Sequence, residues 1–262
     1  MAFCRLSKEK LQGGCAMNRE RQVIVELKNV SKSFATQNGR LQVLTDVSFQ
    51  VYAGEIVALV GPSGCGKTTI LQIITGLLDS DNGGVIKDPD LRLGYVFQEP
   101  RLLPWKTVDQ NISSMQANLL SPPEAAPVRQ KLLERTGLQA YKDAYPLQLS
   151  GGLRQRVELV RALAVKPELI LMDEPFQSVD LALKHRLQEL LLDEYNREGF
   201  GVLLVTHSPE DAVMLADRVI VLSEKPTVIC REIEIDIPRK ERSIKNATIF
   251  SRLAEILQYV LK

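Results

Sequence analysis

Short apolar runs recur along the chain, and most of them end at a glycine or a polar residue. The runs cover residues 56–60, 91–97, 169–172 and 202–205. Runs of this length are typical of strands in a sheet, and the last two predict buried parallel strands with polar residues at their carboxyl ends. Residues 43–51 alternate between apolar and polar side chains instead, which predicts a half-buried antiparallel strand.

Helical spacing appears between and after these runs. Residues 70–74 begin one predicted helix, and residues 181–197 form a long amphipathic helix that ends at Gly199. From about residue 108 to 135 the pattern is helical, but prolines interrupt it from Pro122 onward. No strand pattern returns until Glu168, so residues 99–163 are predicted to form a helical subdomain inserted into a strand-and-helix core.

The two ends of the chain differ from this core. Residues 1–21 are polar and mixed, and we expect a disordered extension there. Val23–Leu27 predicts a first strand, and Asn38-Gly39 predicts a hairpin turn, with Phe34 between the N-terminal strands. Residues 226–262 are predicted to add an alternating edge strand over 228–237 and a helix from about residue 248.

One stretch predicts the chemistry of the core. Gly61-Pro62-Ser63-Gly64-Cys65-Gly66-Lys67-Thr68-Thr69 lies between a predicted strand and a predicted helix, and it fits the phosphate-binding pattern G-x-x-x-x-G-K-[ST]. The backbone N–H groups of such a loop form an anion nest at a helix N-terminus. Lys67 adds a charge for the β- and γ-phosphates, and the Thr68 hydroxyl is a ligand for Mg²⁺. The sequence therefore predicts that the chain binds a nucleoside triphosphate in an α/β fold.

Further polar groups stand where a phosphate site would use them. Ser150 is a predicted helix N-cap, and the glycines that follow it expose N–H groups at the helix start. Asp173 and Glu174 end a buried strand, at the sheet edge where ligands bind in open α/β folds. His207 ends another buried strand at the same predicted edge. We expect Asp173 to hold Mg²⁺, Glu174 to polarise the attacking water and His207 to contact the γ-phosphate.

Composition and charge narrow the class of protein. The chain has 262 residues, 45% of them hydrophobic and 25% charged, which suits one large globular domain. Its net charge of +1 gives no reason to expect a nucleic-acid partner. No run approaches the roughly 20 apolar residues of a membrane span, so a separate chain must supply any span. Cysteines are scattered, and Cys65 is expected to be reactive because it lies near a helix N-terminus.

In chain order, Gly61–Thr68, Gln98, Leu149–Gly152, Asp173-Glu174, Asp180 and His207 resemble the motifs of the nucleotide-binding subunits of ABC transporters. The resemblance covers about residues 22–225. It implies a P-loop NTPase (RecA-like) core with an N-terminal antiparallel β subdomain and a helical insertion subdomain. Residues 98–105 and 171–176 further resemble the importer subfamily that handles nitrate, aliphatic sulfonates and taurine. One departure is Gln177-Ser178-Val179, where Gly-Ala-Leu is commoner, and another is Ser208, where aspartate is usual.

The resemblance also implies roles for single residues. Mg²⁺ would be held by Thr68, Gln98 and Asp173, and hydrolysis would use Glu174, His207 and Gln98. Phe34 would stack on the adenine ring. The remaining ATP contacts would come from Gly61, Pro62, Ser63, Gly64, Cys65, Gly66, Lys67, Thr68, Thr69, Ser150, Gly151, Gly152 and Asp180.

Partners follow from the same resemblance. It implies a head-to-tail homodimer that encloses two ATP molecules at the cytoplasmic face of the inner membrane. The dimer would work with an integral membrane permease, received by the loop Glu99–Trp105, and indirectly with a periplasmic substrate-binding protein. Two alternatives stay open: a soluble ABC-type ATPase that acts on nucleic acid or ribosomes, and a P-loop kinase or GTPase of another family. The first usually has two cassettes, and the second does not require Leu149–Gly152.

Overall fold

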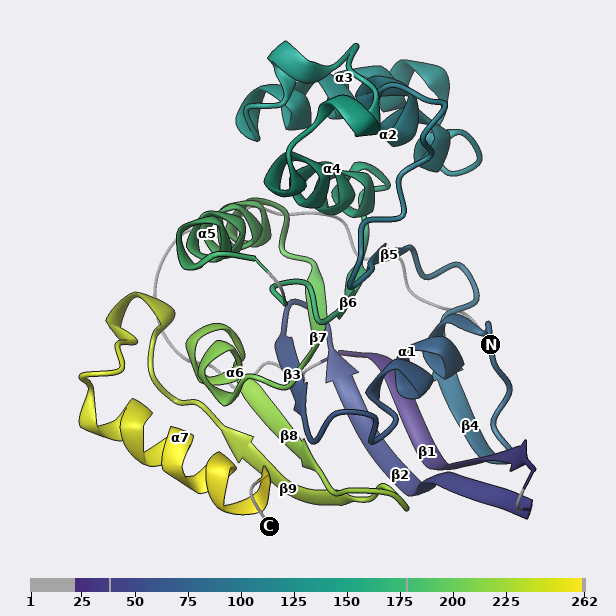
Figure 1. Ribbon diagram of the computed structural model, residues 1–262, viewed down its shortest axis with the longest axis vertical. Coiled ribbons are helices and arrows are strands. Elements are labelled where there is room, and N and C mark those ends of the chain that lie inside the picture. Colours follow the sequence, from purple (N-terminus) through teal and green to yellow (C-terminus); the bar gives the residue numbers. More distant parts are fainter. Residues whose placement is uncertain (1–21, 38, 178, 261–262) are drawn as a thin grey trace.

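A six-stranded, mainly parallel sheet lies at the centre of the structure, a computed structural model that describes residues 22–37, 39–177 and 179–260 (Figure 1). The predicted extension at residues 1–21 and the turn residue Asn38 lie outside the described residues. The spatial order of the sheet is β5 (Leu93–Val96), β6 (Leu169–Asp173), β7 (Gly201–Thr206), β3 (Ile56–Val60), β8 (Arg218–Leu222) and β9 (Ile229–Glu234). Only β9 is antiparallel to its neighbour, and it forms the edge that the alternating pattern predicted.

Alternate residues of the central strands fill two separate cores. In β3, Ile56, Ala58 and Val60 pack on one side with residues of α4, α5 and α6, whereas Val57 and Leu59 pack on the other side with α1 and the antiparallel sheet. Side chains on successive strand residues point to opposite faces, so a strand covered on both faces must be apolar throughout. This explains why the parallel strands are continuous apolar runs.

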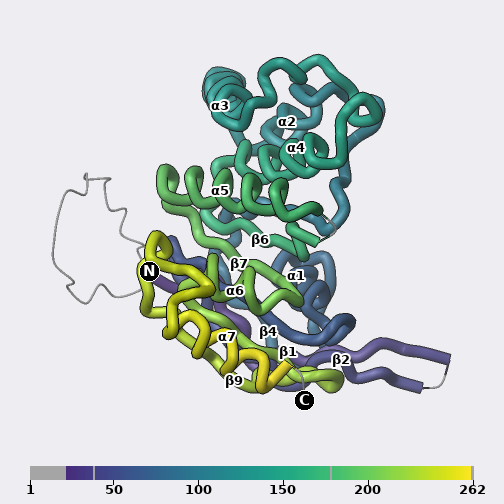
Figure 2. The backbone as a smooth tube through the Cα atoms, turned by 60° about the vertical axis from the view of Figure 1, so that its left-hand side comes forward, coloured from purple at the N-terminus to yellow at the C-terminus, as the bar shows by residue number. Residues whose placement is uncertain are grey.

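A second, three-stranded antiparallel sheet carries the N-terminal part of the chain. Its order is β2 (Gly39–Tyr52), β1 (Val23–Thr36) and β4 (Asn82–Lys87). β1 and β2 form a hairpin that projects from the body of the molecule (Figure 2). Phe34 lies within β1, opposite Leu41, and not between two strands as the sequence predicted.

β4 is an element that the sequence did not predict. The segment before and within it, Asp81-Asn82-Gly83-Gly84, has turn-forming residues and little apolar character. It forms a strand because its backbone pairs with β1, where Leu27 faces Val85. The partner strand, and not the local sequence, therefore decides the conformation of this segment.

Helices surround the central sheet and form a separate layer at one end (Figure 1). That layer contains α2 (Val108–Gln116), α3 (Pro122–Arg135) and α4 (Gly151–Ala164), with the short 3₁₀ turns η1 (Gln139–Tyr141) and η2 (Pro146–Gln148). Pro122 opens α3 and does not interrupt it, because the first turn of a helix tolerates proline. α1 (Lys67–Thr75), α5 (Leu181–Glu198) and α6 (Pro209–Leu215) flank the sheet, and Gly199 caps α5 as predicted.

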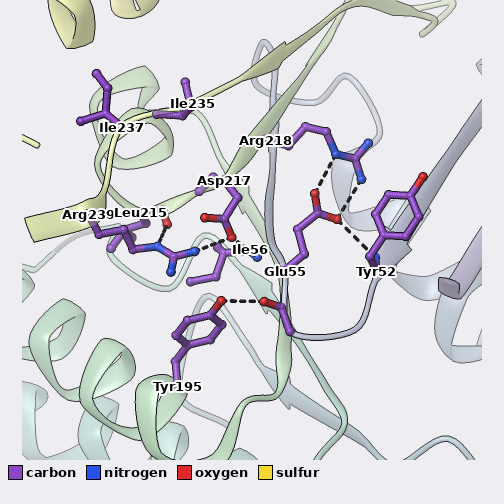
Figure 3. Close-up of polar contacts among 12 residues, drawn as sticks. Tyr52, Glu55, Ile56, Tyr195, Leu215, Asp217, Arg218, Ile235, Ile237 and Arg239 are labelled. Atoms are coloured by element: carbon purple, nitrogen blue, oxygen red, sulfur yellow. Dashed lines mark hydrogen bonds and ion pairs between the residues drawn. The ribbon is translucent and has the colours of Figure 1, made fainter. Parts of the chain in front are cut away.

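The C-terminal segment returns to the core through η3 (Arg239–Glu241) and α7 (Ala247–Val260). α7 lies along β9 and α6 (Figures 1 and 2). Arg239 donates to Asp217 and, over 2.8 Å, to the carbonyl of Leu215, so the segment is fastened to the start of β8 (Figure 3). Among the described residues, no helix is both long and apolar enough to span a membrane.

Candidate functional site

The phosphate-binding loop joins the end of β3 to the start of α1. Gly66 caps α1 in a left-handed conformation, with φ of 112°, and so lacks the strain that a side chain would bring. A methyl group on Gly66 would also lie 2.7 Å from Cγ1 of Val43 in β2. This distance is too short for a side chain at position 66, so glycine is what lets the antiparallel sheet pack directly on the loop.

Lys67 lies under the loop that precedes it. Its ammonium group donates to the carbonyls of Gly61 and Pro62 over 2.8 and 2.9 Å, and its side chain is 5% exposed. It also lies 3.8 Å from Oε1 of Glu174. Because an ammonium group has three donors, Lys67 can bond to the two loop carbonyls and also face the carboxylate that follows β6.

Asp173 ends β6 beside the first turn of α1. Thr68 donates its hydroxyl to Oδ1 of Asp173 over 3.1 Å. Burial raises the pKa of Asp173, the hydrogen bond from Thr68 opposes that shift, and the neighbouring Glu174 carboxylate adds to it. The hydroxyl and the carboxylate thus share one half-enclosed position next to the loop.

Glu174 has an uncommon backbone for its residue type. Its φ is 48°, in the left-handed region that non-glycine residues rarely adopt, and its N–H donates to the carbonyl of Val205 over 3.0 Å. Strained conformations of this kind cluster at functional sites. Its Oε2 contacts Nδ1 of His207, which follows the end of β7.

These side chains line two adjoining cavities. One, of about 310 Å³, is lined by Ser63, Gly64, Gly66, Lys67, Thr68, Thr69, Gln98, Asp173, Glu174 and Gln177. The other, of about 160 Å³, is lined by Glu174, Phe176, Gln177, Lys184, Thr206, His207, Ser208 and Asp211. The structure therefore brings Gln98, Asp173, Glu174 and His207 to one region, at the carboxyl ends of the parallel strands.

Several predicted site residues lie elsewhere. Ser150 accepts a hydrogen bond from the N–H of Leu153 over 3.3 Å, as a helix N-cap should, while Gly152 faces Leu183 of α5. Asp180 caps α5 through the N–H of Leu183 over 3.0 Å. Among the described residues, neither the Ser150–Gly152 segment, nor Asp180, nor Phe34 lines the loop cavity. Their expected ATP contacts stay predictions.

Cys65 does not have the surroundings that the sequence suggested. Its side chain is 2% exposed, and burial raises the pKa of its thiol, an effect that the nearby charge of Lys67 only partly offsets. The expectation of a reactive thiol is therefore wrong. A helix N-terminus stabilises a thiolate only when the sulfur is not desolvated at the same time.

Gly61 and Pro62 do not line the larger cavity, although their carbonyls hold Lys67.

Two residues that contact this region belong to none of the predicted motifs. Gln177 lines both cavities and accepts a hydrogen bond from Nε2 of Gln98. Thr227 is fully buried and donates its hydroxyl to the carbonyl of Cys65, which connects the segment after β8 to the phosphate-binding loop. Gln177 stands where glycine is commoner, and this departure was a signal for its position at the site. Nothing in the sequence pattern marks Thr227.

The donor atoms of the larger cavity fit a magnesium ion. The Thr68 hydroxyl, the Asp173 carboxylate and the Gln98 carboxamide are hard oxygen donors, and the first two lie in direct contact. Among the described residues no group of three or more His, Cys, Asp or Glu side chains is placed to hold a metal ion. Mg²⁺ does not need such a cluster, because it takes one or two carboxylates and completes its shell with phosphate oxygens and water.

Comparisons with known proteins agree with this geometry. The family model described as ABC transporter matches residues 44–177. The aliphatic sulfonates import ATP-binding protein SsuB 1 of Xanthomonas axonopodis pv. citri is 41% identical over 242 residues, covering 89% of this chain and 94% of that protein. The nitrate import ATP-binding protein NrtD of Synechocystis sp. is 37% identical over 243 residues, covering 90% of this chain and 91% of that protein.

A solved structure gives the same result for the fold. A dimeric ATP-binding cassette in a post-hydrolysis state with ADP and phosphate superposes with a TM-score of 0.73 at 29% identity, covering 82% of this chain and all of that one. The P-loop NTPase fold with its antiparallel sheet and helical insertion is thereby confirmed. The chain belongs to the ABC transporter family. It is an ABC-type ATPase, and its relatives confirm the resemblance to the nitrate and sulfonate importer subfamily.

Proposed function

We propose that this chain energises the uptake of a small anion of the nitrate, aliphatic sulfonate or taurine type. It would do so as the ATP-hydrolysing subunit of a bacterial importer, bound to the cytoplasmic face of the inner membrane. The names of its relatives support this class of cargo and favour an importer over a soluble ATPase that acts on nucleic acid or ribosomes.

The observation that carries the proposal is an incomplete nucleotide site. Lys67, Thr68, Asp173 and Glu174 share one cavity, but none of the residues described as lining it belongs to the Ser150–Gly152 segment. That segment exposes a serine and the start of α4, which suits a phosphate contact made to another molecule. We infer that a second copy supplies it, so that ATP closes a head-to-tail dimer and hydrolysis opens it.

Within that site, we assign the roles as follows. Lys67 neutralises the β- and γ-phosphates. Thr68, Asp173 and Gln98 would hold Mg²⁺, which would supply positive charge for the phosphoryl oxygens. Glu174 orients the attacking water and receives its proton. His207 holds the Glu174 carboxylate through Nδ1 and steadies the transferring phosphoryl group.

Substitutions at Glu174 and Lys67 test the ATPase roles. Glu174→Gln keeps the shape of the side chain but removes the base, so turnover should fall by about 10²–10⁴-fold while ATP still binds. Lys67→Ala should lose tight ATP binding. Glu189→Gln, on the exposed face of α5, is the matched control and should behave as wild type. Wild-type hydrolysis by Glu174→Gln would disprove its role as the base.

Mixed dimers test the shared site. Lys67→Ala and Ser150→Arg should each abolish hydrolysis in homodimers, because each removes one half of every site. A mixture of the two contains dimers in which the intact loop of one chain meets the intact Ser150 segment of the other, so part of the activity should return. If mixing restores nothing although the mixture still forms ATP-dependent mixed dimers, the composite site is wrong.

The permease and the cargo need separate tests. Trp105 is 70% exposed in the loop after β5, and Leu102 packs at the edge of the helical layer, which suits a docking position for a permease helix. Cross-links from Trp105→Cys to permease loops should form in the assembled transporter. The cognate periplasmic protein should bind nitrate, taurine or an alkanesulfonate, and binding of none of them would contradict the proposed cargo.

A further inference from the structure

Gln177 lies between the two cavities of the nucleotide site. It follows Phe176 in the loop from β6 to α5, lines both cavities, and is half-buried. Its own N–H donates to the carbonyl of Glu174 over 3.1 Å, so its backbone is fixed to the turn that carries the proposed base. A side chain in this place can act on either cavity.

The side chain of Gln177 reaches across to Gln98. Nε2 of Gln98 donates to Oε1 of Gln177, although the two residues are 79 positions apart in the chain. Gln98 is exposed and follows β5, whereas Gln177 belongs to the loop after β6. The contact therefore connects two loops that leave neighbouring strands of the sheet.

The chemistry of a carboxamide gives this contact a consequence. A glutamine side chain has an NH₂ group, which only donates, and a carbonyl oxygen, which only accepts. When Gln177 holds the nitrogen of Gln98, the carbonyl oxygen of Gln98 must lie on the other side of the amide carbon. An oxygen is the atom that Mg²⁺ takes as a ligand, and a nitrogen that carries two protons is not.

We propose that Gln177 is a positioning residue that fixes the amide of Gln98, so that Gln98 presents its oxygen to the metal. The inference rests on the proposed role of Gln98 as a Mg²⁺ ligand. A glycine at position 177, which is commoner in the family that the sequence resembles, has no side chain with which to make this contact. This positioning of Gln98 is thus particular to chains with a hydrogen-bond acceptor at position 177.

Two variants of equal length separate the acceptor from the shape of the side chain. Gln177→Met keeps the length but has no oxygen, and Gln177→Glu keeps an acceptor oxygen. The probe is Mn²⁺ binding to the full chain with bound ADP, followed by electron paramagnetic resonance, with the Mg²⁺ dependence of hydrolysis as a second readout. Gln177→Met should raise the metal concentration for half-saturation about 2- to 10-fold, the range expected for one neutral hydrogen bond. Gln177→Glu presents only acceptor oxygens, so it should not raise that concentration.

The effect must pass through Gln98. Gln98→Ala should weaken Mn²⁺ binding, and adding Gln177→Met to it should change nothing more. Melting temperatures of all variants should match the wild type, since neither side chain belongs to a buried core.

The failures are distinguishable. If Gln98→Ala weakens metal binding but Gln177→Met does not, the positioning inference is wrong and the proposed function stands. The positioning inference is also wrong if the two effects add in the double variant, because Gln177 then acts independently of Gln98. If Gln98→Ala itself leaves metal binding unchanged, the proposed role of Gln98 is wrong, and the inference falls with it.

Discussion

Arg218 forms a buried ion pair with Glu55, and its replacement by an apolar residue should destabilise the fold. Its guanidinium donates to Glu55 over 2.9 and 3.0 Å (Figure 3). It also donates to the carbonyl of Gln50 over 2.6 Å and to Glu232. The side chains of Arg218 and Glu55 are both 7% exposed. Burial alone lowers the pKa of Arg218, but the hydrogen bonds to Glu55 and Glu232 outweigh it and raise the pKa.

The expected cost follows from the partner that is left behind. Arg218→Met leaves the Glu55 carboxylate buried without its cation, which should destabilise the fold by about 3–5 kcal/mol. At about 2–4 °C per kcal/mol for a domain of this size, the melting temperature should fall by roughly 6–20 °C. Adding Glu55→Met should restore most of the loss, because a pair of apolar side chains replaces the ion pair without a stranded charge.

Urea unfolding followed by circular dichroism measures this cycle. Arg252→Met is the matched control, since Arg252 pairs with Glu255 at 3.2 Å where both side chains are partly exposed, and the change should cost at most about 1 kcal/mol. ATP affinity should not change, because Glu55 and Arg218 lie at the amino ends of β3 and β8, whereas the phosphate-binding loop follows the carboxyl end of β3. A loss under about 1 kcal/mol for Arg218→Met, or a double variant as unstable as the sum of the singles, would refute the reasoning.

Three further predictions concern smaller features. Cys65 should react with iodoacetamide at neutral pH more slowly than the exposed Cys230, because burial raises the pKa of the Cys65 thiol and leaves less thiolate. Mass spectrometry of the modified peptides measures both rates, and equal rates would contradict the prediction. Hydrogen bonds from Ser33, and then from Lys32, hold the pKa of Asp81 well below its ordinary 3.8, so Asp81→Asn should lower the melting temperature at neutral pH. That difference is complete above the ordinary pKa and should shrink as the pH falls below it; a difference that grows in acid would reverse the assigned sign. Gly94→Ala should destabilise the contact between β5 and α4 by about 1–3 kcal/mol, because a Cβ there would lie 2.7 Å from the carbonyl oxygen of Ala162. Gly84→Ala, with open space around the new methyl group, is its control in the same unfolding assay.

The sequence by itself determined the elements whose signal is local. The apolar runs of β3, β6 and β7 specified strands because both faces of the parallel sheet are covered. Ser150 specified a helix start because its hydroxyl accepts from the N–H of Leu153 in the first turn. Lys67 and Thr68 were recognisable because the loop needs fixed residue types at fixed spacing.

Only the tertiary structure decided what depends on partners distant in the chain. β4 became a strand because β1 pairs with it, and Phe34 was placed inside β1 by its register with Leu41. Cys65 is buried in the core that the central strands share with the antiparallel sheet, and its carbonyl accepts from Thr227, 162 positions away in the chain. The contact between Gln98 and Gln177 likewise joins two loops that only the order of the sheet brings together. Local pattern fixes conformation and chemistry, but desolvation and hydrogen-bond partners are set by packing, which a sequence pattern does not contain.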